Sequence, residues 1–174
     1  MTPLKVPSFE ELLDSASVSA LHLEMRDTYA VTEEAEDVAL WRSGAWVLED
    51  GRRTLADWLA LVERTVARGV VVRRARIVSE PVTEYIRYEH ALTPLNLEAG
   101  EDVRWLPRRQ ALGIAVPAND FWLIDGRTVR FNHFTGEGEA AEPEMSEDPA
   151  IAALCASAFG DVWKRALEHH EFKV

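Results

Sequence analysis

The chain has 174 residues, of which 47% are apolar and 28% charged, which is typical of one soluble globular domain. Its net charge of -11 disfavours direct binding to nucleic acid or to an anionic membrane. The sequence contains neither an apolar run of the ~18 residues that a membrane helix needs nor an export signal at its start. We therefore expect a single cytoplasmic domain over residues 1–174.

The first predicted elements are a short helix and a strand. Ser8 and Glu11 have the spacing of a capping box, which begins a helix. Residues 21–25 alternate apolar and polar side chains, which predicts a strand with one buried face. Residues 34–42 favour a second short helix, and residues 49–51 a turn after it.

The clearest pattern is a helix, a glycine and a strand in that order. Thr54 and Asp57 resemble a second capping arrangement, and apolar residues then recur at helical spacing up to Gly69. Residues 70–78 are rich in β-branched side chains, which favour a strand. This order is typical of the returning half of a β-α-β unit.

The second half of the chain predicts further strands and two helices. Pro81 suits the first turn of a helix, which we expect to end before Pro94. Residues 136–148 are the one weak linker candidate. We predict an α/β fold, or alternatively α+β, with a mixed, partly parallel sheet of about six strands flanked by helices. The remaining predicted elements are strands at 103–106, 121–124 and 128–134, a turn at Asp125-Gly126, and a last helix that begins at Asp148-Pro149.

No motif in the sequence names a reaction. No two of the five histidines are four residues apart, and Cys155 is the one cysteine, so a helical metal site and a disulfide are not expected. Phosphate-binding glycine loops and a nucleophile elbow are also absent. Adjacent acids such as Glu33 and Glu34 are interpreted as solvated turns. We expect no metal and no cofactor, and identify no catalytic residue.

The distribution of arginine is the informative feature. Residues 1–63 carry a net charge of -8, residues 64–109 of +3 and residues 110–174 of -6, and every basic residue of the middle block is arginine. Guanidinium groups suit carboxylates, phosphates and aromatic faces. Two interpretations stay open, internal ion pairs and a binding site for a small anion or an acidic protein. The candidate binding residues are Arg73, Arg74, Arg76, Tyr85, Arg87, Tyr88, Arg104, Trp105, Arg108 and Arg109.

Several strings of the sequence resemble a family of uncharacterised actinobacterial proteins, a domain of unknown function. The resemblance implies a helix-turn-helix regulator as a partner, because members of this family are often encoded beside one. The strings are LHLEMRDTYAV at 21–31, RGVVVRR at 68–74, VSEP at 78–81, YIRYE at 85–89, AGEDVRWLPRR at 99–109 and DFWL at 120–123.

A second resemblance concerns the fold. The order of helix, Arg-Gly, arginine-rich strand, apolar strand ending at Asp125 and closing helix is similar to one half of a phospholipase-D-like domain. Active members carry a His-x-Lys-x-x-x-x-Asp motif, in which histidine is the nucleophile and lysine binds phosphate. Alignment on Asp125 places Ala118 and Asp120 at the histidine and lysine positions. The resemblance therefore implies the scaffold without the phosphodiesterase residues.

These observations favour a non-enzymatic regulatory or interaction protein that contacts a helix-turn-helix regulator through its arginine-rich segment. The first alternative is a sensor that binds a nucleotide or a phosphorylated metabolite over the same arginines. The second alternative is an enzyme of undetected class, which would use Glu24, Asp27, Glu89 and Tyr88.

Overall fold

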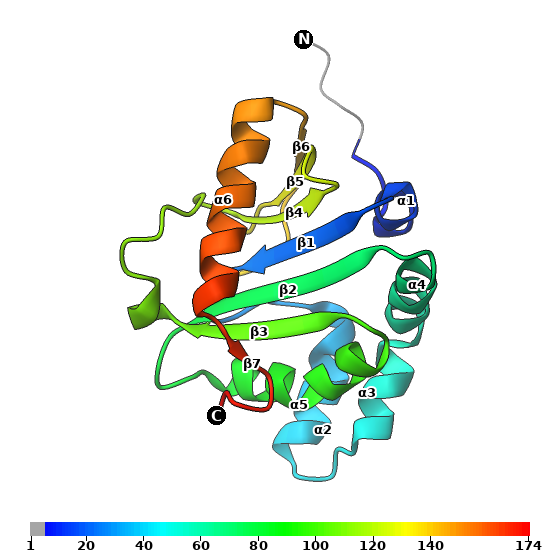
Figure 1. Cartoon of the computed structure of the whole chain (residues 1–174). Helices are drawn as coiled ribbons and strands as arrows, with labels where there is room; N and C mark the ends of the chain where they lie inside the picture. The colour runs from blue at the N-terminus through cyan, green and yellow to red at the C-terminus, as the bar shows by residue number, and fades with distance from the viewer. Residues whose placement is uncertain (1–5) are drawn as a thin grey trace.

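The structure is a computed structural model that describes residues 6–174, without the side chain of Glu33. One seven-stranded sheet, in the order β6-β5-β4-β1-β2-β3-β7, forms its centre (Figure 1). The neighbouring strands β1, β2 and β3 are parallel, and every other neighbouring pair is antiparallel. The predicted mixed α/β architecture is confirmed, with seven strands where about six were expected. The strands are β1 (Ser19–Glu24), β2 (Val71–Val78), β3 (Asp102–Pro107), β4 (Asp120–Ile124), β5 (Thr128–Asn132), β6 (Glu144–Ser146) and β7 (Leu167–Glu168).

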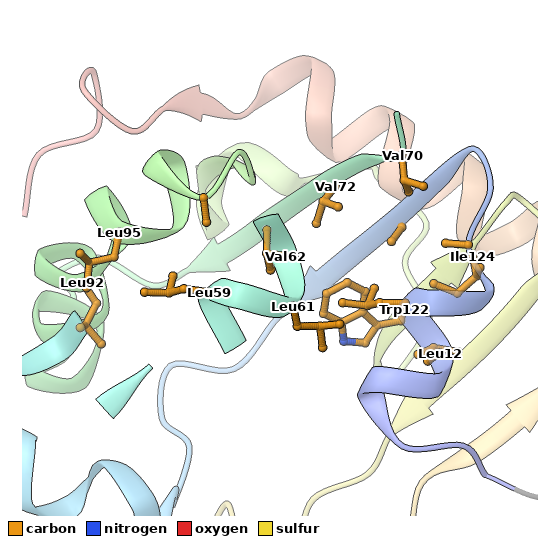
Figure 2. Close-up of a cluster of buried hydrophobic side chains, with 14 of the residues drawn as sticks. Leu12, Leu59, Leu61, Val62, Val70, Val72, Leu92, Leu95, Trp122 and Ile124 are labelled. Atoms are coloured by element: carbon orange, nitrogen blue, oxygen red, sulfur yellow. The ribbon is translucent and has the colours of Figure 1, made fainter. Parts of the chain in front are cut away.

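Helices cover both faces of the sheet. The helix α6 (Pro149–Arg165) packs on one face, where Leu23, Ala75 and Phe121 are buried beneath it. The other face carries the remaining helices, and Figure 2 shows Trp122 among the aliphatic side chains of that core. These helices are α1 (Phe9–Ser15), α2 (Ala35–Arg42), α3 (Leu48–Thr54), α4 (Ala56–Ala67) and α5 (Glu84–Glu98), with the 3-10 turn η1 (Thr32–Glu34). The 3-10 turn η2 (Arg108–Ala111) instead contacts α6.

The capping box and the β-α-β return are both confirmed. The Ser8 hydroxyl accepts the Glu11 N–H at 3.1 Å, and the Glu11 carboxylate accepts the Ser8 N–H at 2.8 Å. Gly69 follows α4 with φ +88°, a left-handed conformation that glycine adopts without strain. The chain then enters β2, which pairs in parallel with β1.

The turn predicted at residues 49–51 is wrong, because these residues lie within α3. Asp50 accepts the Val47 N–H at 2.8 Å and so begins this helix. Gly51 is buried, and a Cβ at this position would lie 2.4 Å from Cδ2 of Leu92. The glycine therefore provides space for packing. Thr54 ends α3 and does not cap α4.

The predicted bounds of α5 are also wrong at both ends. The Thr83 hydroxyl accepts the Ile86 N–H at 3.2 Å, so this helix begins after Thr83. Pro81 lies before it, in a cis peptide bond with Glu80. The helix continues through Pro94 because the following residues, such as Leu95, are buried. This packing outweighs the hydrogen bond that a proline removes.

The acidic stretch predicted as a linker belongs to the fold. Residues 144–146 form β6, which pairs with β5, and Phe134 forms a bridge with Ala140. Backbone pairing therefore fixes both ends of this segment on the edge of the sheet.

Candidate functional site

The ten candidate residues do not share one surface. Alternation along the strands places Arg73 and Arg104 on the face that α6 covers. Their guanidinium carbons lie 5.0 Å and 4.5 Å from the centroid of a Trp163 ring. Arg104 also lies 3.5 Å from the Glu168 carboxylate. Both guanidinium groups thus contribute to the packing of α6.

Arg74 and Arg76 lie on the opposite face, where they are buried. Only 12% of the Arg74 side chain and 5% of the Arg76 side chain are exposed. Arg74 donates to Glu101 at 2.7 Å, and Arg76 contacts Glu24 at 2.8 Å and donates to Glu89. Breaking one buried pair leaves an uncompensated charge. These two guanidinium groups are therefore committed to internal carboxylates.

The candidate aromatic residues are largely internal as well. Tyr88 is buried, with its hydroxyl 3.4 Å from Asp37, and Trp105 is buried, with its indole N–H directed to His169 at 3.3 Å. Neither ring offers a face at the surface. Tyr85 differs, because its ring lines a surface hollow.

Arg87, Arg108 and Arg109 are the exposed members of the candidate set. Arg108 donates to the Met25 carbonyl at 2.6 Å and to the Ser79 hydroxyl at 3.0 Å. It thus connects the ends of β1 and β2. That these three residues contact a partner stays a prediction.

The four residues proposed for an enzyme of undetected class also do not form one site. Glu24 and Glu89 meet at Arg76. Asp27 instead accepts the Ser79 N–H and hydroxyl, both at 2.7 Å, and Tyr88 contacts Asp37. No hollow described by the structure gathers all four.

A hollow of about 850 Å³ opens after the carboxyl ends of β1 and β2. Ligands of open α/β sheets commonly bind at this end of the strands. Its walls come from the segment after β1, from α2, from the first turn of α5 and from the loop after β5. We call it the outer hollow, and it is lined by Tyr29, Ala30, Val31, Thr32, Glu34, Ala35, Val38, Ala39, Arg42, Tyr85, Phe134, Gly138, Glu139 and Ala140.

Glu34 is one of two described carboxylates that line the outer hollow, the other being Glu139. Oε2 of Glu34 accepts the Tyr85 hydroxyl at 3.0 Å. Burial first, and then the charge of Glu89, raise the pKa of Glu34 from 4.5 to about 7, although the Tyr85 hydrogen bond and the charge of Arg76 act to lower it. The charge of Glu34 therefore changes near neutral pH. Glu34 lies in the 3-10 turn η1, but its side chain is half-buried and not fully solvated as expected for adjacent acids.

A second tyrosine–carboxylate pair supports the wall of the outer hollow. The Tyr29 hydroxyl donates to Asp120, which also accepts the Met25 N–H at 2.9 Å. Burial raises the pKa of Asp120 to about 6 and that of the Tyr29 phenol well above its ordinary value. Tyr29 is thus fixed as a neutral ring at the end of β1.

A smaller hollow of about 160 Å³ adjoins this site, and Glu34 lines both. We call it the inner hollow. It reaches the buried ion pairs, because Arg74 and Glu89 lie in its wall. The full lining is Glu34, Leu55, Trp58, Arg74, Glu89, Leu92 and Asn96.

Hydrogen bonds to backbone carbonyls join the distant segments that form the outer hollow. The Ala30 N–H donates to the Gly138 carbonyl at 3.0 Å, and Gly138 has φ +91°, a conformation that favours glycine. On the other side, the Thr83 hydroxyl donates to the Asp27 carbonyl at 2.6 Å. The segment after β1 is therefore held between the loop after β5 and the start of α5.

Sequence reasoning missed Tyr29, Glu34 and Phe134 as site residues. One signal was present, since residues that follow parallel strands gather at one edge of a sheet. Tyr29 follows the strand that ends at Glu24. Phe134 carried no such signal, because its place depends on the antiparallel half of the sheet.

The described residues, 6–174, contain no group of three or more histidine, cysteine, aspartate or glutamate side chains placed to hold a metal ion. Within the same range no helix has both the length and the apolar character needed to cross a membrane.

Comparison with solved structures defines the class of fold as phospholipase-D-like. The chain is similar to Nuc, a phospholipase D family member from Salmonella typhimurium, with 14% identity, a TM-score of 0.51, and 91% of this chain and 86% of that chain covered. It is also similar to TrmBL2, an archaeal chromatin protein, with 12% identity and a TM-score of 0.49. That match covers 92% of this chain and 48% of that one, so the chain spans about half of TrmBL2.

The chain belongs to the family described as a domain of unknown function (DUF6879), which matches residues 7–174. No curated protein matches it. The predicted membership of a family of unknown function and the predicted fold are both confirmed. Asp125, the residue used to align the phosphodiesterase motif, accepts the backbone N–H groups of Val18 at 2.7 Å and Ser19 at 2.9 Å. Asp125 therefore fixes the backbone at the start of β1.

Proposed function

We propose that this protein is a non-enzymatic regulatory protein that binds a small molecule in the outer hollow. The observation that carries the proposal is a hollow with aromatic and aliphatic walls around Glu34, a half-buried carboxylate held by Tyr85. A volume of about 850 Å³ lies within the ~300–1,000 Å³ of ligand sites, which typically combine apolar walls with a few fixed polar groups.

Two further observations support binding without catalysis. When the phosphodiesterase motif is aligned on Asp125, Ala118 and Asp120 stand where active phospholipase-D-like domains carry histidine and lysine. Asp120 is instead engaged by Tyr29 and the Met25 N–H. The polar groups behind the outer hollow are paired with one another, an arrangement that fixes the shape of a binding site.

A thermal-shift screen tests this proposal. The screen would include amines, nucleotides and phosphorylated metabolites, since a ligand at ~100 times its dissociation constant adds ~2.7 kcal/mol of stability. Ala39→Phe places a ring in the outer hollow, whereas Leu40→Phe adds a ring at the neighbouring exposed position of α2, outside the lining. We expect hits that stabilise the wild type and Leu40→Phe but not Ala39→Phe. A screen in which no compound distinguishes the two variants would contradict the proposal.

A partner protein such as a helix-turn-helix regulator is a second proposal, favoured by one exposed segment. Leu112 is 80% exposed and Val116 39% exposed, and both follow the exposed Arg108 and Arg109 in the chain. Arg108 supports the ends of β1 and β2, so Arg109→Glu and Leu112→Ser are the informative variants. We expect both to weaken binding to a purified regulator in biolayer interferometry. Leu154→Ser, at an exposed position of α6, is the control, and equal binding by all three variants would contradict this proposal.

A further inference from the structure

We infer that the ligand of the outer hollow is an organic cation, an amine with an apolar or aromatic body that places its charge beside Glu34 and among the rings of Tyr29, Tyr85 and Phe134. This inference rests on the proposed function and names the chemical class of the ligand.

The three rings form the first line of evidence. The Tyr29 ring lies 5.9 Å from the Tyr85 ring at 54° and 5.1 Å from the Phe134 ring at 69°. All three residues line the outer hollow. Aromatic faces attract ammonium groups through their negative quadrupole, and such groups of rings bind amines and methylated amines.

The hydroxyl groups of the two tyrosines are already engaged. Tyr29 donates to Asp120, and Tyr85 donates to Glu34. Neither phenol therefore has its hydrogen available for an anionic ligand. One cation already uses this cluster, because the guanidinium carbon of Arg26 lies 5.3 Å from the centroid of the Phe134 ring.

The balance of charge is the second line of evidence. Arg42, the cation in the lining, donates to Glu84 at 2.9 Å. Arg74 of the inner hollow is paired with Glu101. In the part of the chain that the structure describes, two carboxylates, Glu34 and Glu139, line the outer hollow, against one guanidinium group, Arg42, which is already paired. This balance disfavours phosphate and favours an amine.

The titration of Glu34 agrees with this geometry. Glu89 and Tyr85 of α5, Glu24 of β1 and Arg76 of β2 act on Glu34, and its pKa of about 7 shows that burial and neighbouring carboxylates outweigh Arg76. A bound cation favours the ionised carboxylate and lowers that pKa. Binding of an amine at neutral pH should therefore release a proton.

Three compounds that share a benzyl group and are cationic, neutral or anionic test the inference. Benzylamine, benzyl alcohol and benzyl phosphate are titrated into the wild-type protein at pH 7.5 and followed by protein NMR. We expect benzylamine to bind at least tenfold more tightly than benzyl alcohol, and benzyl phosphate more weakly than both.

Glu34→Gln should reduce the affinity for benzylamine at least tenfold and leave the affinity for benzyl alcohol within twofold. Glu137→Gln, outside the lining, is the matched control. Wild-type affinity for benzylamine should fall between pH 8 and pH 6, and that of Glu34→Gln should not.

The outcomes separate this inference from the proposed function. If benzyl alcohol or benzyl phosphate binds as well as benzylamine, and Ala39→Phe blocks that binding, the site is real and the inferred class is wrong. The class is also wrong if benzylamine does not bind and every screen ligand that Ala39→Phe excludes is neutral or anionic. If neither the series nor the screen yields binding that Ala39→Phe blocks, both proposals are wrong.

Discussion

The Tyr85 hydroxyl donates to Glu34 at 3.0 Å and so connects the first turn of α5 with the residue that precedes α2. This hydrogen bond stabilises the ionised form of a carboxylate that burial disfavours. Glu34 and Tyr85 both line the outer hollow, so this contact forms part of its wall.

Tyr85→Phe should raise the pKa of Glu34 further above about 7, because the hydrogen bond that favours the ionised carboxylate is lost. The measurement is a pH titration of the Glu34 carboxyl carbon by NMR. Tyr88→Phe is the control, because the Tyr88 hydroxyl contacts Asp37. A Glu34 pKa that falls in Tyr85→Phe would contradict this account.

Arg76→Leu should lower the free energy of unfolding by about 3–5 kcal/mol, because Glu24 and Glu89 would stay buried without their shared guanidinium. Urea denaturation measures this change. Arg87→Leu alters an exposed arginine of α5 and should change stability by less than ~0.5 kcal/mol. Equal effects of the two substitutions would show that the buried pairs contribute little.

The stability of the protein should depend on the charge of Glu34. Its folded-state pKa of about 7 exceeds the ordinary 4.5, so its contribution is fully present below pH 4.5 and is lost as pH rises through 7. Denaturation between pH 4.5 and 8 should therefore show Glu34→Gln gaining stability relative to the wild type as pH rises. Glu36→Gln, at an exposed position of α2, is the control for removing one charge. A constant difference between wild type and Glu34→Gln would contradict the raised pKa.

Gly51→Ala and Gly160→Ala should change stability in opposite directions. A Cβ at Gly51 would meet Leu92 at 2.4 Å and Trp46 at 2.9 Å, so this substitution should cost about 1–3 kcal/mol. Gly160 lies within α6, and a Cβ added there would meet no neighbouring atom within 4 Å, so alanine should stabilise that helix by ~0.5–1 kcal/mol. Thermal unfolding of the wild type and of both variants measures these changes in stability. Destabilisation by both would indicate that Gly160 has a role beyond the helix.

Local patterns predicted the elements that bury one face. Alternation along β1, and the helix-glycine-strand order around Gly69, are properties of a few neighbouring residues, and they were sufficient for the parallel part of the sheet. Gly51 and Pro94 misled the prediction, because distant side chains decide both positions. Leu92 requires the glycine, and the buried residues after Pro94 keep that turn helical.

The candidate site was harder to predict for a related reason. Arg73 and Arg74 are adjacent in sequence, yet the strand directs them to opposite faces of the sheet. The two positive charges, although adjacent in the sequence, therefore do not lie on the same surface. The outer hollow combines Glu34, Tyr85 and Phe134, and their proximity depends on the order of strands across the whole sheet.

The lengths of the edge strands affect how the protein behaves at high concentration. β6 has three residues and β7 two, whereas β2, with eight, is enclosed between β1 and β3. Exposed sheet edges act as templates for pairing with other chains, and short or charged edges reduce this tendency. Glu144 and Glu168 lie in the two edge strands. β2, the longest of the described strands, is thus paired on both sides and offers no free edge to another chain, which favours a protein that stays dispersed in a crowded solution.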